Sequence, residues 1–365
     1  MFVQVTIVGV GLIGGSLGLA LRRRRLAGQV VGVDKNPHNL LLAIEAGAID
    51  RAAAGLAEGL AGAEVVVLAV PVMEVLELLP AIGRMLSPGT VVTDVGSTKA
   101  AVCRRAAEAM PSHSWFVGGH PMAGSEQAGM AGADPYLFEN AYYILTPLPA
   151  TPGGALGKVR AMAEGVGARV VEMDPAFHDT AVALISHLPH LAAVALANVL
   201  AEAPHGESCL SLAAGGFRDT TRVASGNPQM WKDIFLTNSQ PVLEALACFR
   251  AQLERLEKAI REGREEEILY LLQKAKKLRD ALPARARGYL PAMYEIVVAV
   301  PDRPGMLARL TGQLGQAGIN IADIEILRVR EGEGGSIRLA FATPAEQEQA
   351  TSILRGAGYQ VVKRE

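Results

Sequence analysis

The residue best suited to proton chemistry in this sequence is a histidine enclosed by glycines. His120 follows Gly118 and Gly119, and Gly124 lies four residues further on. Glycines let a backbone turn tightly and approach a ligand closely, and a neutral imidazole can accept a proton near neutral pH. A sheet-like apolar run precedes the segment, so we predict that His120 lies in a loop that presents it to a ligand. The alternative is a hydrogen-bonded loop histidine without a chemical role.

A glycine-rich segment near the N-terminus has the spacing of a dinucleotide site. Residues 9–15 read GVGLIGG, between a predicted strand and a predicted helix. The glycines permit a tight turn and let a pyrophosphate reach the helix N-terminus, where N–H groups and the dipole favour anions. Asp34, twenty residues after Gly14, can accept the ribose hydroxyls and would repel the phosphate of NADP. The arginines at 22–25 could bind that phosphate, but they also suit a helix C-terminus. We predict NAD, bound by Gly9, Gly11, Leu12, Ile13, Gly14, Asp34, Pro71 and Ser97.

These residues need a scaffold that brings loops together, and the first 172 residues predict one. Apolar runs of strand length alternate with segments of helix length; the runs cover residues 3–8, 30–33, 65–70, 91–95, 142–145 and 169–171. Their continuous apolarity indicates strands covered on both faces, as in the parallel sheet of a doubly wound α/β Rossmann-type domain. Ligands bind beyond the carboxyl ends of such strands. The loops that begin near Gly9, Asp34, Pro71, Val95 and Gly118 should therefore open on one crevice.

The rest of the chain predicts an all-α domain and a small C-terminal domain. Residues 182–200 are apolar nearly all round, as in a buried helix, and apolar stripes at helical spacing cover 244–282. We expect these helices to form a dimer, with packing inside one chain as the alternative. A linker at 283–291 precedes a βαββαβ pattern of the ferredoxin-like kind, with strands at 294–300, 319–329, 336–343 and 359–363 and helices at 306–317 and 344–357. The predicted domains are residues 1–172, 173–285 and 293–365.

Other polar residues have both a chemical and a structural interpretation. Ser97 precedes a predicted helix, either as its N-cap or as a hydroxyl at the mouth of the crevice. His187 and His190 lie in an apolar run without the further Cys, Asp or Glu ligands that a zinc site needs, so we predict no metal. Arg222 follows the glycine pair that begins at Gly215. Its guanidinium could bind a carboxylate with two hydrogen bonds, or it could form a surface ion pair.

The composition narrows the class of protein. The 365 residues carry a net charge of −2, and the pI near 6.4 gives no electrostatic footprint for nucleic acid. Three cysteines far apart in the sequence are typical of reduced cytosolic thiols. The N-terminus is apolar before it is basic, the reverse of a secretory signal, and the apolar run at 182–200 is interrupted by histidines. We therefore predict a cytoplasmic protein without nucleic-acid or membrane partners.

Taken together, five motifs resemble those of the prephenate dehydrogenase family of tyrosine biosynthesis. They are the glycine run at 9–15, DVGSTK at 94–99, GHPMAGS at 119–125, SHLPH at 186–190 and GFRDTTR at 216–222. They follow one another in the family's order through the two predicted N-terminal domains. The C-terminal segment, with PDRPG at 301–305 and GINI at 318–321, resembles an ACT domain, a small amino-acid-sensing module found in part of the family.

The resemblance implies a reaction and roles for single residues. The reaction is the NAD-dependent oxidative decarboxylation of prephenate to 4-hydroxyphenylpyruvate. The resemblance implies that His120 accepts the hydrogen bond of the substrate hydroxyl and that Ser97 lies between this histidine and the nicotinamide. It further implies that Arg222 holds a substrate carboxylate. The other residues that it places at the substrate pocket are His190, Trp231, Ser125, Gly215 and the possible polar gate Glu126.

The ACT resemblance implies regulation by an amino acid. We expect this amino acid to be tyrosine, bound between two such domains of a homodimer. The loop before Met306 would offer helix N–H groups to its carboxylate, and Asn320 could bind its polar end. The predicted regulatory residues are Asp302, Gly305, Met306, Asn320 and Ile321. The alternative is a packing module without a ligand, because this topology serves many functions.

Three other functions compete with this interpretation. Arogenate dehydrogenase acts on a substrate with an amine in place of the pyruvyl keto group, and no residue in the sequence separates the two activities. A β-hydroxyacid dehydrogenase would share the glycine motif, but it should carry a catalytic lysine, which the run around His187 lacks. A non-catalytic sensor of nucleotide and amino acid would leave the coincidence of Ser97, His120 and Arg222 unexplained.

Overall fold

The computed structural model describes residues 1–124, 129–281, 294–301, 303–327 and 335–364. It contains two compact units, Met1–Gly288 and Tyr289–Glu365, and each is described by itself. Three predictions lie outside the described residues. They are the substrate residues Ser125 and Glu126, the regulatory residue Asp302, and the linker at 283–291.

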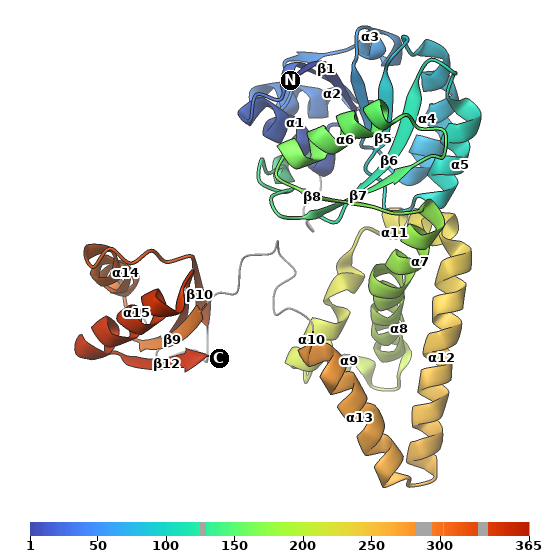
Figure 1. The fold of residues 1–365 in the computed structure, drawn as a ribbon. Helices are drawn as coiled ribbons and strands as arrows, with labels where there is room; N and C mark the ends of the chain where they lie inside the picture. The colour runs from blue at the N-terminus through green and yellow to red at the C-terminus, as the bar shows by residue number, and fades with distance from the viewer. Residues whose placement is uncertain (125–128, 282–293, 302, 328–334, 365) are drawn as a thin grey trace. The chain divides into compact units, whose positions relative to one another are not determined.

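The larger unit is built on an eight-stranded sheet with the order β3-β2-β1-β4-β5-β6-β7-β8 (Figure 1). Its strands are β1 (Phe2–Val8), β2 (Ala27–Val33), β3 (Arg51–Ala52), β4 (Val65–Leu68), β5 (Val91–Asp94), β6 (Trp115–Pro121), β7 (Tyr142–Pro147) and β8 (Arg169–Glu172). The first six strands pair in parallel. The Rossmann-type fold predicted from the apolar runs is confirmed.

The sheet is not parallel throughout, which corrects the expectation drawn from continuous apolarity. β7 runs antiparallel to β6, and β8 pairs in parallel with β7. A parallel neighbour needs a crossover, usually a helix, but the described residues between β6 and β7 contain only the short 3₁₀ helix η1 (Met130–Gly132). The chain therefore returns directly beside β6, and the Met122 N–H donates to the Tyr142 carbonyl at 2.7 Å.

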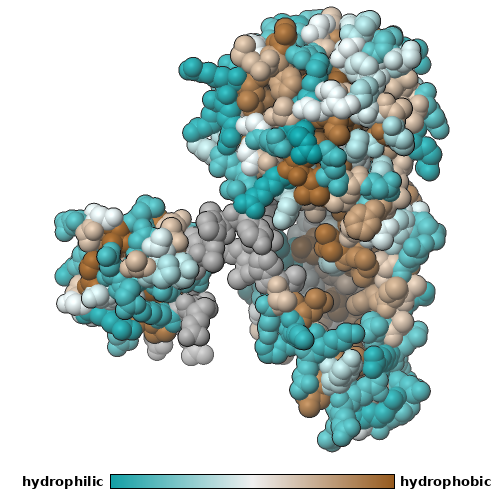
Figure 2. All heavy atoms as spheres, viewed as in Figure 1, coloured by the Kyte–Doolittle hydropathy of each residue, from teal (hydrophilic) through white to brown (hydrophobic). Residues whose placement is uncertain are grey.

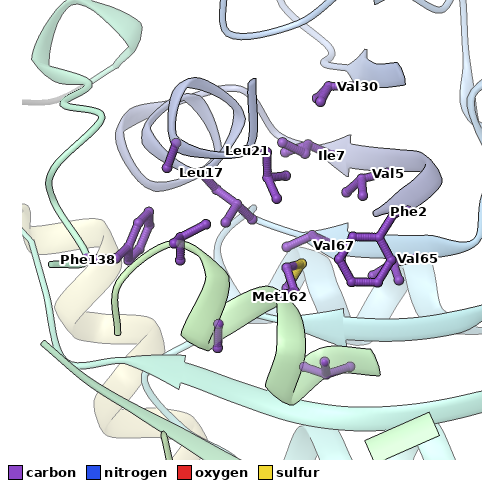
Figure 3. Close-up of a cluster of buried hydrophobic side chains, with 14 of the residues drawn as sticks. Phe2, Val5, Ile7, Leu17, Leu21, Val30, Val65, Val67, Phe138 and Met162 are labelled. Atoms are coloured by element: carbon purple, nitrogen blue, oxygen red, sulfur yellow. The ribbon is translucent and has the colours of Figure 1, made fainter. Parts of the chain in front are cut away.

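Helices cover both faces of this sheet. They are α1 (Leu12–Arg23), α2 (Pro37–Glu45), α3 (Leu56–Leu60), α4 (Val72–Met85), α5 (Ala100–Ala109) and α6 (Gly153–Gly165). On one face, Val5 and Ile7 of β1 pack with Leu17 of α1 and Met162 of α6 (Figure 3). A second apolar cluster fills the other face between the sheet, α4 and α5. Because both faces are buried, the strand sequences are apolar at consecutive positions.

A helical segment completes the larger unit. Its elements are α7 (Pro175–Val182), the π-helix η2 (Ala183–His187), α8 (Leu188–Glu202), α9 (Gly206–Leu210), α10 (Gly215–Thr221), the 3₁₀ helix η3 (Arg222–Ser225), α11 (Pro228–Thr237), α12 (Ser239–Arg261) and α13 (Glu265–Asp280). The run α7-η2-α8 is one continuous helix of 28 residues, long and apolar enough to meet the criteria for a membrane span. Its polar residues contact the sheet domain, as described below.

The long apolar helix is not buried within one chain, contrary to the expectation for residues 182–200. Only 28% of its most apolar window is buried, and Ile185 and Val199 are each 67% exposed. Figure 2 shows hydrophobic side chains gathered on the visible face of the helical segment. The internal core of the segment is small and centres on Ala183, Val242 and Ala245. A single chain therefore leaves apolar surface of the kind that interfaces cover.

The C-terminal unit has the predicted βαββαβ order. Its elements are β9 (Tyr294–Val300), α14 (Met306–Gln316), β10 (Asp323–Leu327), β11 (Gly335–Phe341), α15 (Pro344–Gly356) and β12 (Gln360–Arg364), and the antiparallel sheet has the order β10-β11-β9-β12. Ile296, Val298 and Leu339 of the sheet share a core with Leu310 of α14 and Leu354 of α15. The predicted ferredoxin-like fold of this unit is confirmed.

Candidate active site

The glycine segment forms a cradle at the carboxyl end of β1. Gly9 has φ +93°, a conformation that favours glycine, and a Cβ on Gly14 would collide with the Gly9 carbonyl. A Cβ on Gly11, by contrast, would meet nothing within 4 Å. Gly11 is the N-cap of α1, and no side chain caps this helix. The open space over free helix N–H groups fits a dinucleotide pyrophosphate.

The carboxylate of Asp34 is fixed beside this cradle. Asp34 follows β2, and its Oδ2 accepts a hydrogen bond from the Val10 N–H at 2.9 Å. Its Oδ1 accepts from the Asn36 N–H at 2.8 Å. The remaining lone pairs can accept ribose hydroxyls. Pro71 is the exposed N-cap of α4, after the neighbouring strand β4, so all three elements meet at one edge of the sheet.

His120 lies within a strand and not in a loop, which corrects the prediction. It is the next-to-last residue of β6 and stands opposite Ile144 of β7. The returning strand β7 makes this segment a strand, because it supplies the partners that a sequence pattern cannot show. The side chain is buried, with 8% of His120 exposed. The strand therefore fixes the imidazole more firmly than a glycine-rich loop would.

The imidazole of His120 begins a chain of three side chains. His120 Nδ1 lies 2.8 Å from Nε2 of His178, and Nδ1 of His178 lies 2.8 Å from Oδ1 of Asp179. Asp179 also accepts the backbone N–H groups of Lys99 at 2.7 Å and Ala100 at 2.9 Å. The carboxylate thus caps the N-terminus of α5 as well as holding His178.

The hydrogen bonds between these three side chains fix the tautomer of each ring. With both rings neutral, an ionised carboxylate, which can only accept, requires His178 to donate from Nδ1 to Asp179 and leaves its Nε2 as an acceptor. His120 must then donate from Nδ1 to His178. The second nitrogen of His120, Nε2, is left with a lone pair. A neutral imidazole with that nitrogen free can accept a hydrogen bond from a substrate hydroxyl.

The electrostatic surroundings keep His120 neutral. Burial lowers the pKa of His120 well below its ordinary value, and the neighbouring His178, Lys99 and His187 lower it further. Burial also lowers the pKa of His187 to about 4. A group of neutral imidazoles in a desolvated position is typical of functional sites. The arrangement can therefore accept a proton without first losing one at neutral pH.

Ser97 lies in the turn between β5 and α5, at the same edge of the sheet. It is partly exposed. Its interpretation as a helix N-cap is wrong, because α5 begins at Ala100 with Lys99 as N-cap and no side-chain cap of its own. The capping oxygens come from Asp179 on α7. The hydroxyl of Ser97 is thus not committed to capping this helix.

A second group of aromatic and imidazole rings lies on the helical segment. The ring of His190 stacks on Trp231, with centroids 3.5 Å apart and planes 9° apart. A Cβ on Gly226 would collide with the ring of Trp231 and would make a tight contact with that of His190. Within the described residues, Nδ1 of His190 is a buried polar atom without a hydrogen-bond partner. Such an atom is a candidate contact for a ligand.

The other predicted residues of the helical segment lie around this stack. Arg222, exposed, begins η3 and directly precedes Val223, whose backbone hydrogen-bonds to His190. Gly215 begins α10 on the exposed surface, where an added side chain would meet Asp219 of the same helix. In the described part of the chain, no group of three or more His, Cys, Asp or Glu side chains has the arrangement of a metal site.

Comparison with known proteins places this geometry in a family. Residues 17–172 match the profile described as "Prephenate dehydrogenase, nucleotide-binding domain", and residues 174–274 match "Prephenate dehydrogenase, dimerization domain". Residues 294–355 match the ACT domain. The prephenate dehydrogenase of Bacillus subtilis is 36% identical over 355 residues, which are 96% of this chain and 95% of that protein.

The chain belongs to the prephenate dehydrogenase family. The resemblance drawn from the five motifs is thereby confirmed, and the enzyme is an oxidoreductase with a dinucleotide-binding domain and an ACT domain.

Two solved structures of the family cover the larger unit. Prephenate dehydrogenase from Aquifex aeolicus, in complex with hydroxyphenyl propionate and NAD⁺, is 35% identical with a TM-score of 0.74. The match covers 78% of this chain and 99% of that chain. Arogenate dehydrogenase from Synechocystis is 36% identical with a TM-score of 0.68, over 76% of this chain and 99% of that chain.

Sequence reasoning missed two residues of the site in this family member. His178 is 58 positions from His120, and Asp179 is 80 positions from Lys99. Both lie on α7, which begins after the N-cap Asp174. An adjacent His-Asp pair on a helix after the last strand is the signal that could have identified them. Only the packing of α7 against α5 shows that they reach His120.

The neutral histidines predict that this enzyme loses stability in acid. The pKa of His187 is about 4 in the folded state and about 6.5 in an unfolded chain. Between these values the unfolded state binds more protons, so the free energy of unfolding falls as the pH falls. We expect the thermal unfolding midpoint to decrease from about pH 6.5 toward about pH 4. His187→Gln should reduce this dependence, and an equal slope in both proteins would contradict the assignment.

Proposed function

We propose that this enzyme oxidises prephenate to 4-hydroxyphenylpyruvate and carbon dioxide, with NAD as the hydride acceptor. The observation that carries the proposal is the chain His120–His178–Asp179, which leaves a neutral acceptor nitrogen at the carboxyl edge of the sheet. The dinucleotide cradle at Gly9, Gly11 and Gly14 opens at the same edge.

The chemistry needs an acceptor for one proton. The substrate carries a ring hydroxyl, and the carbon that bears this hydroxyl loses a hydride. The ring carboxylate leaves as carbon dioxide, and the ring becomes aromatic. The nicotinamide of NAD, when bound, accepts that hydride. Nε2 of His120 accepts the hydroxyl hydrogen as the oxygen becomes a carbonyl. The electrons of the broken carbon–carbon bond return to that oxygen, which takes back the proton, so no net proton is released.

Each side chain behind His120 assists this step. The positive charge that develops on His120 is adjacent to His178, and the carboxylate of Asp179 lies behind that ring. A positioned base of this kind typically contributes about 10²- to 10⁴-fold to a rate. By the family resemblance, Ser97 orients His120 and the nicotinamide. His190 and Trp231 line the substrate pocket, where the buried Nδ1 of His190 can bind a polar group of the ligand.

The first test is NADH formation by the purified enzyme with NAD and either prephenate or arogenate. Turnover of prephenate is the expected result. Turnover of arogenate alone would retain the roles of His120 and Ser97 but change the substrate. Similarity to the arogenate dehydrogenase of Synechocystis is the observation that favours arogenate as the second candidate substrate. No turnover of either substrate would contradict the proposal.

Arg222 is proposed to bind a carboxylate of the substrate. Its position beside Val223, which contacts His190 through the backbone, is consistent with a place at the pocket. We expect Arg222→Ala to weaken substrate binding by about 1.5 to 3 kcal/mol, the range for a hydrogen bond to a charged group, and chiefly to raise KM. Arg218→Ala, a change of the same type in α10, is the control. An unchanged KM together with a lower melting temperature would assign Arg222 a structural role instead.

The ACT domain is proposed to bind tyrosine as a feedback inhibitor. Gly305, with φ +85°, is the N-cap of α14, and no side chain caps this helix. The Met306 N–H donates to the Arg303 carbonyl at 3.3 Å, so it is the N–H groups after it in the first turn that can bind an amino-acid carboxylate. A cavity of about 570 Å³ lies beside this turn and is lined by Pro301, Met306, Arg309 and Tyr359 among others. Asn320 and Ile321 would complete the site across an interface between two domains.

Tyrosine is expected to lower the rate of the wild-type enzyme. Asn320→Ala should raise the tyrosine concentration needed for half inhibition about tenfold or more, because a hydrogen bond to a charged group contributes about 1.5 to 3 kcal/mol. The uninhibited kcat should not change. Isothermal titration with tyrosine checks binding directly. Inhibition of both proteins at the same tyrosine concentration would remove Asn320 from the site.

The enzyme is proposed to act as a cytoplasmic homodimer. The exposed apolar residues of the helical segment, such as Ile185 and Val199, favour a second copy as the partner that covers them. The family description of residues 174–274 as a dimerization domain supports this assembly. Sedimentation of the purified chain at micromolar concentration measures it, and a monomer would contradict the proposal.

A further inference from the structure

A fully buried ion pair lies next to His120 and has no place in the proton path proposed above. Asp94 is the last residue of β5, and Lys99 is the N-cap of α5. Both side chains are 0% exposed, and the ammonium of Lys99 contacts Oδ2 of Asp94. The turn that the pair closes, residues 95–98, carries Ser97.

The pair also occupies both polar groups of Gly119, the residue before His120. Nζ of Lys99 donates to the Gly119 carbonyl at 2.8 Å, and the Gly119 N–H donates to Oδ1 of Asp94 at 3.1 Å. The Gly96 N–H donates to Oδ2 of Asp94 at 2.9 Å. One ion pair therefore holds the residue before His120 and the residue before Ser97.

These contacts lie where the backbone ladder between β5 and β6 has ended. The last paired residues of these two strands are Thr93 and Val117. At His120, β6 is paired through its backbone with β7 on its other side. Beyond the last backbone pair, the side chains of Asp94 and Lys99 therefore provide the hydrogen bonds that connect β5 and α5 to β6 beside His120.

The stability of the fold does not by itself explain such a pair. Removing two charges from water costs several kcal/mol each, and well-packed neutral residues of similar volume are often as stable as a buried ion pair. A function in placement accounts for the two side chains better, because both of them bind backbone groups beside predicted catalytic residues.

We propose that Asp94 and Lys99 are positioning residues that set the placement of His120 relative to Ser97. The inference rests on the proposed function, which assigns those two residues their catalytic roles. Neither member of the pair needs to touch the substrate. Their ion pair fixes the Gly119 peptide on one side and the turn with Ser97 on the other.

The charge of Lys99 has a second consequence for His120. Among the described residues, the titratable groups that act on this imidazole are His178 from α7, His187 from η2 and Lys99 at the start of α5, and Lys99 is paired with Asp94 of β5. Lys99 is among the groups that lower the pKa of His120, after burial and His178. Removal of both charges of the pair should therefore move the pKa of His120 upward.

The test compares wild type with the double variant Asp94→Asn/Lys99→Met, which removes both charges and leaves neither one alone in the interior. Lys276→Met/Asp280→Asn makes the same two changes at an exposed pair on α13 and is the control. The measurements are circular dichroism with thermal unfolding, kcat and KM with the substrate that wild type turns over, and the pH profile of kcat. Titration of His120 by NMR of ¹³C-labelled histidine, assigned with His120→Asn, gives its pKa without turnover.

We expect the double variant to fold and to lose about 10²-fold in kcat, the scale for a misplacement near 1 Å, with KM changed less. The acid limb of kcat and the NMR pKa of His120 should both move to higher pH. A folded variant with wild-type kcat and pH profile would overturn the proposal. A variant that does not fold would also overturn it, because the pair would then be an element of stability. An inactive wild type would instead contradict the proposed function, and the NMR titration would still test the effect on His120.

Discussion

Replacement of His120 by Asn is expected to lower kcat about 10²- to 10⁴-fold, the contribution of a positioned acid–base group. Asn can occupy the buried position and donate to His178 from its amide, but its remaining groups are too weakly basic to take the substrate proton. KM should change little, because the lost interaction belongs to the transition state. Steady-state kinetics of NADH formation measure both constants.

The matched control for this prediction is His113→Asn. His113 precedes β6 at the opposite edge of the sheet, and its Nε2 lies 3.2 Å from the Leu86 carbonyl. The variant His113→Asn makes the same chemical change in the same part of the chain, at a residue that is not in the site. We expect kcat near that of wild type. A His120→Asn enzyme with an unaltered kcat would remove His120 from the mechanism.

The second large effect is expected for Asp179→Asn. The Asn oxygen, in the place of Oδ2, can still accept the Ala100 N–H. The amide then takes the place of Oδ1, which in the wild type accepts from both the Lys99 N–H and His178. This amide can donate to Nδ1 of His178, which turns this ring into the other tautomer. His178 would then donate to His120, and Nε2 of His120 would carry the hydrogen that blocks it as an acceptor. We expect kcat to fall about 10²-fold or more and the melting temperature to fall only slightly, because the Lys99 N–H loses its acceptor while the Ala100 N–H keeps one.

The control for this tautomer argument is Asp174→Asn. Asp174 caps α7 by accepting from the N–H groups of Ala176 and Phe177, so the variant makes the same change at a helix cap without a bond to an imidazole. It should retain wild-type kcat. If Asp179→Asn and Asp174→Asn lose activity equally, the effect of Asp179 is on helix capping and not on the proton path. The ¹³C-histidine spectrum of Asp179→Asn would show the tautomer directly.

The local sequence determined the fold class and the dinucleotide cradle. The glycines at 9–15 and the carboxylate of Asp34 are close in sequence to the turn that they build, and strand, turn and helix follow one another within one unit. Apolar runs identified the strands for the same reason, because burial of both faces leaves a pattern at consecutive positions. The βαββαβ order of the C-terminal unit was readable on the same grounds.

Tertiary structure decided the surroundings of His120. The sequence indicated the imidazole, but its place in a strand depends on β7, which pairs from more than twenty residues away. His178 and Asp179 reach it from α7, and Asp94 and Lys99 hold the residue before it. These contacts join positions far apart in the chain, so no local periodicity encodes them. The same reason applies to the long helix at 182–200. Its apolar composition indicated that its surface must be buried, but only the structure showed that a single chain leaves most of that surface exposed.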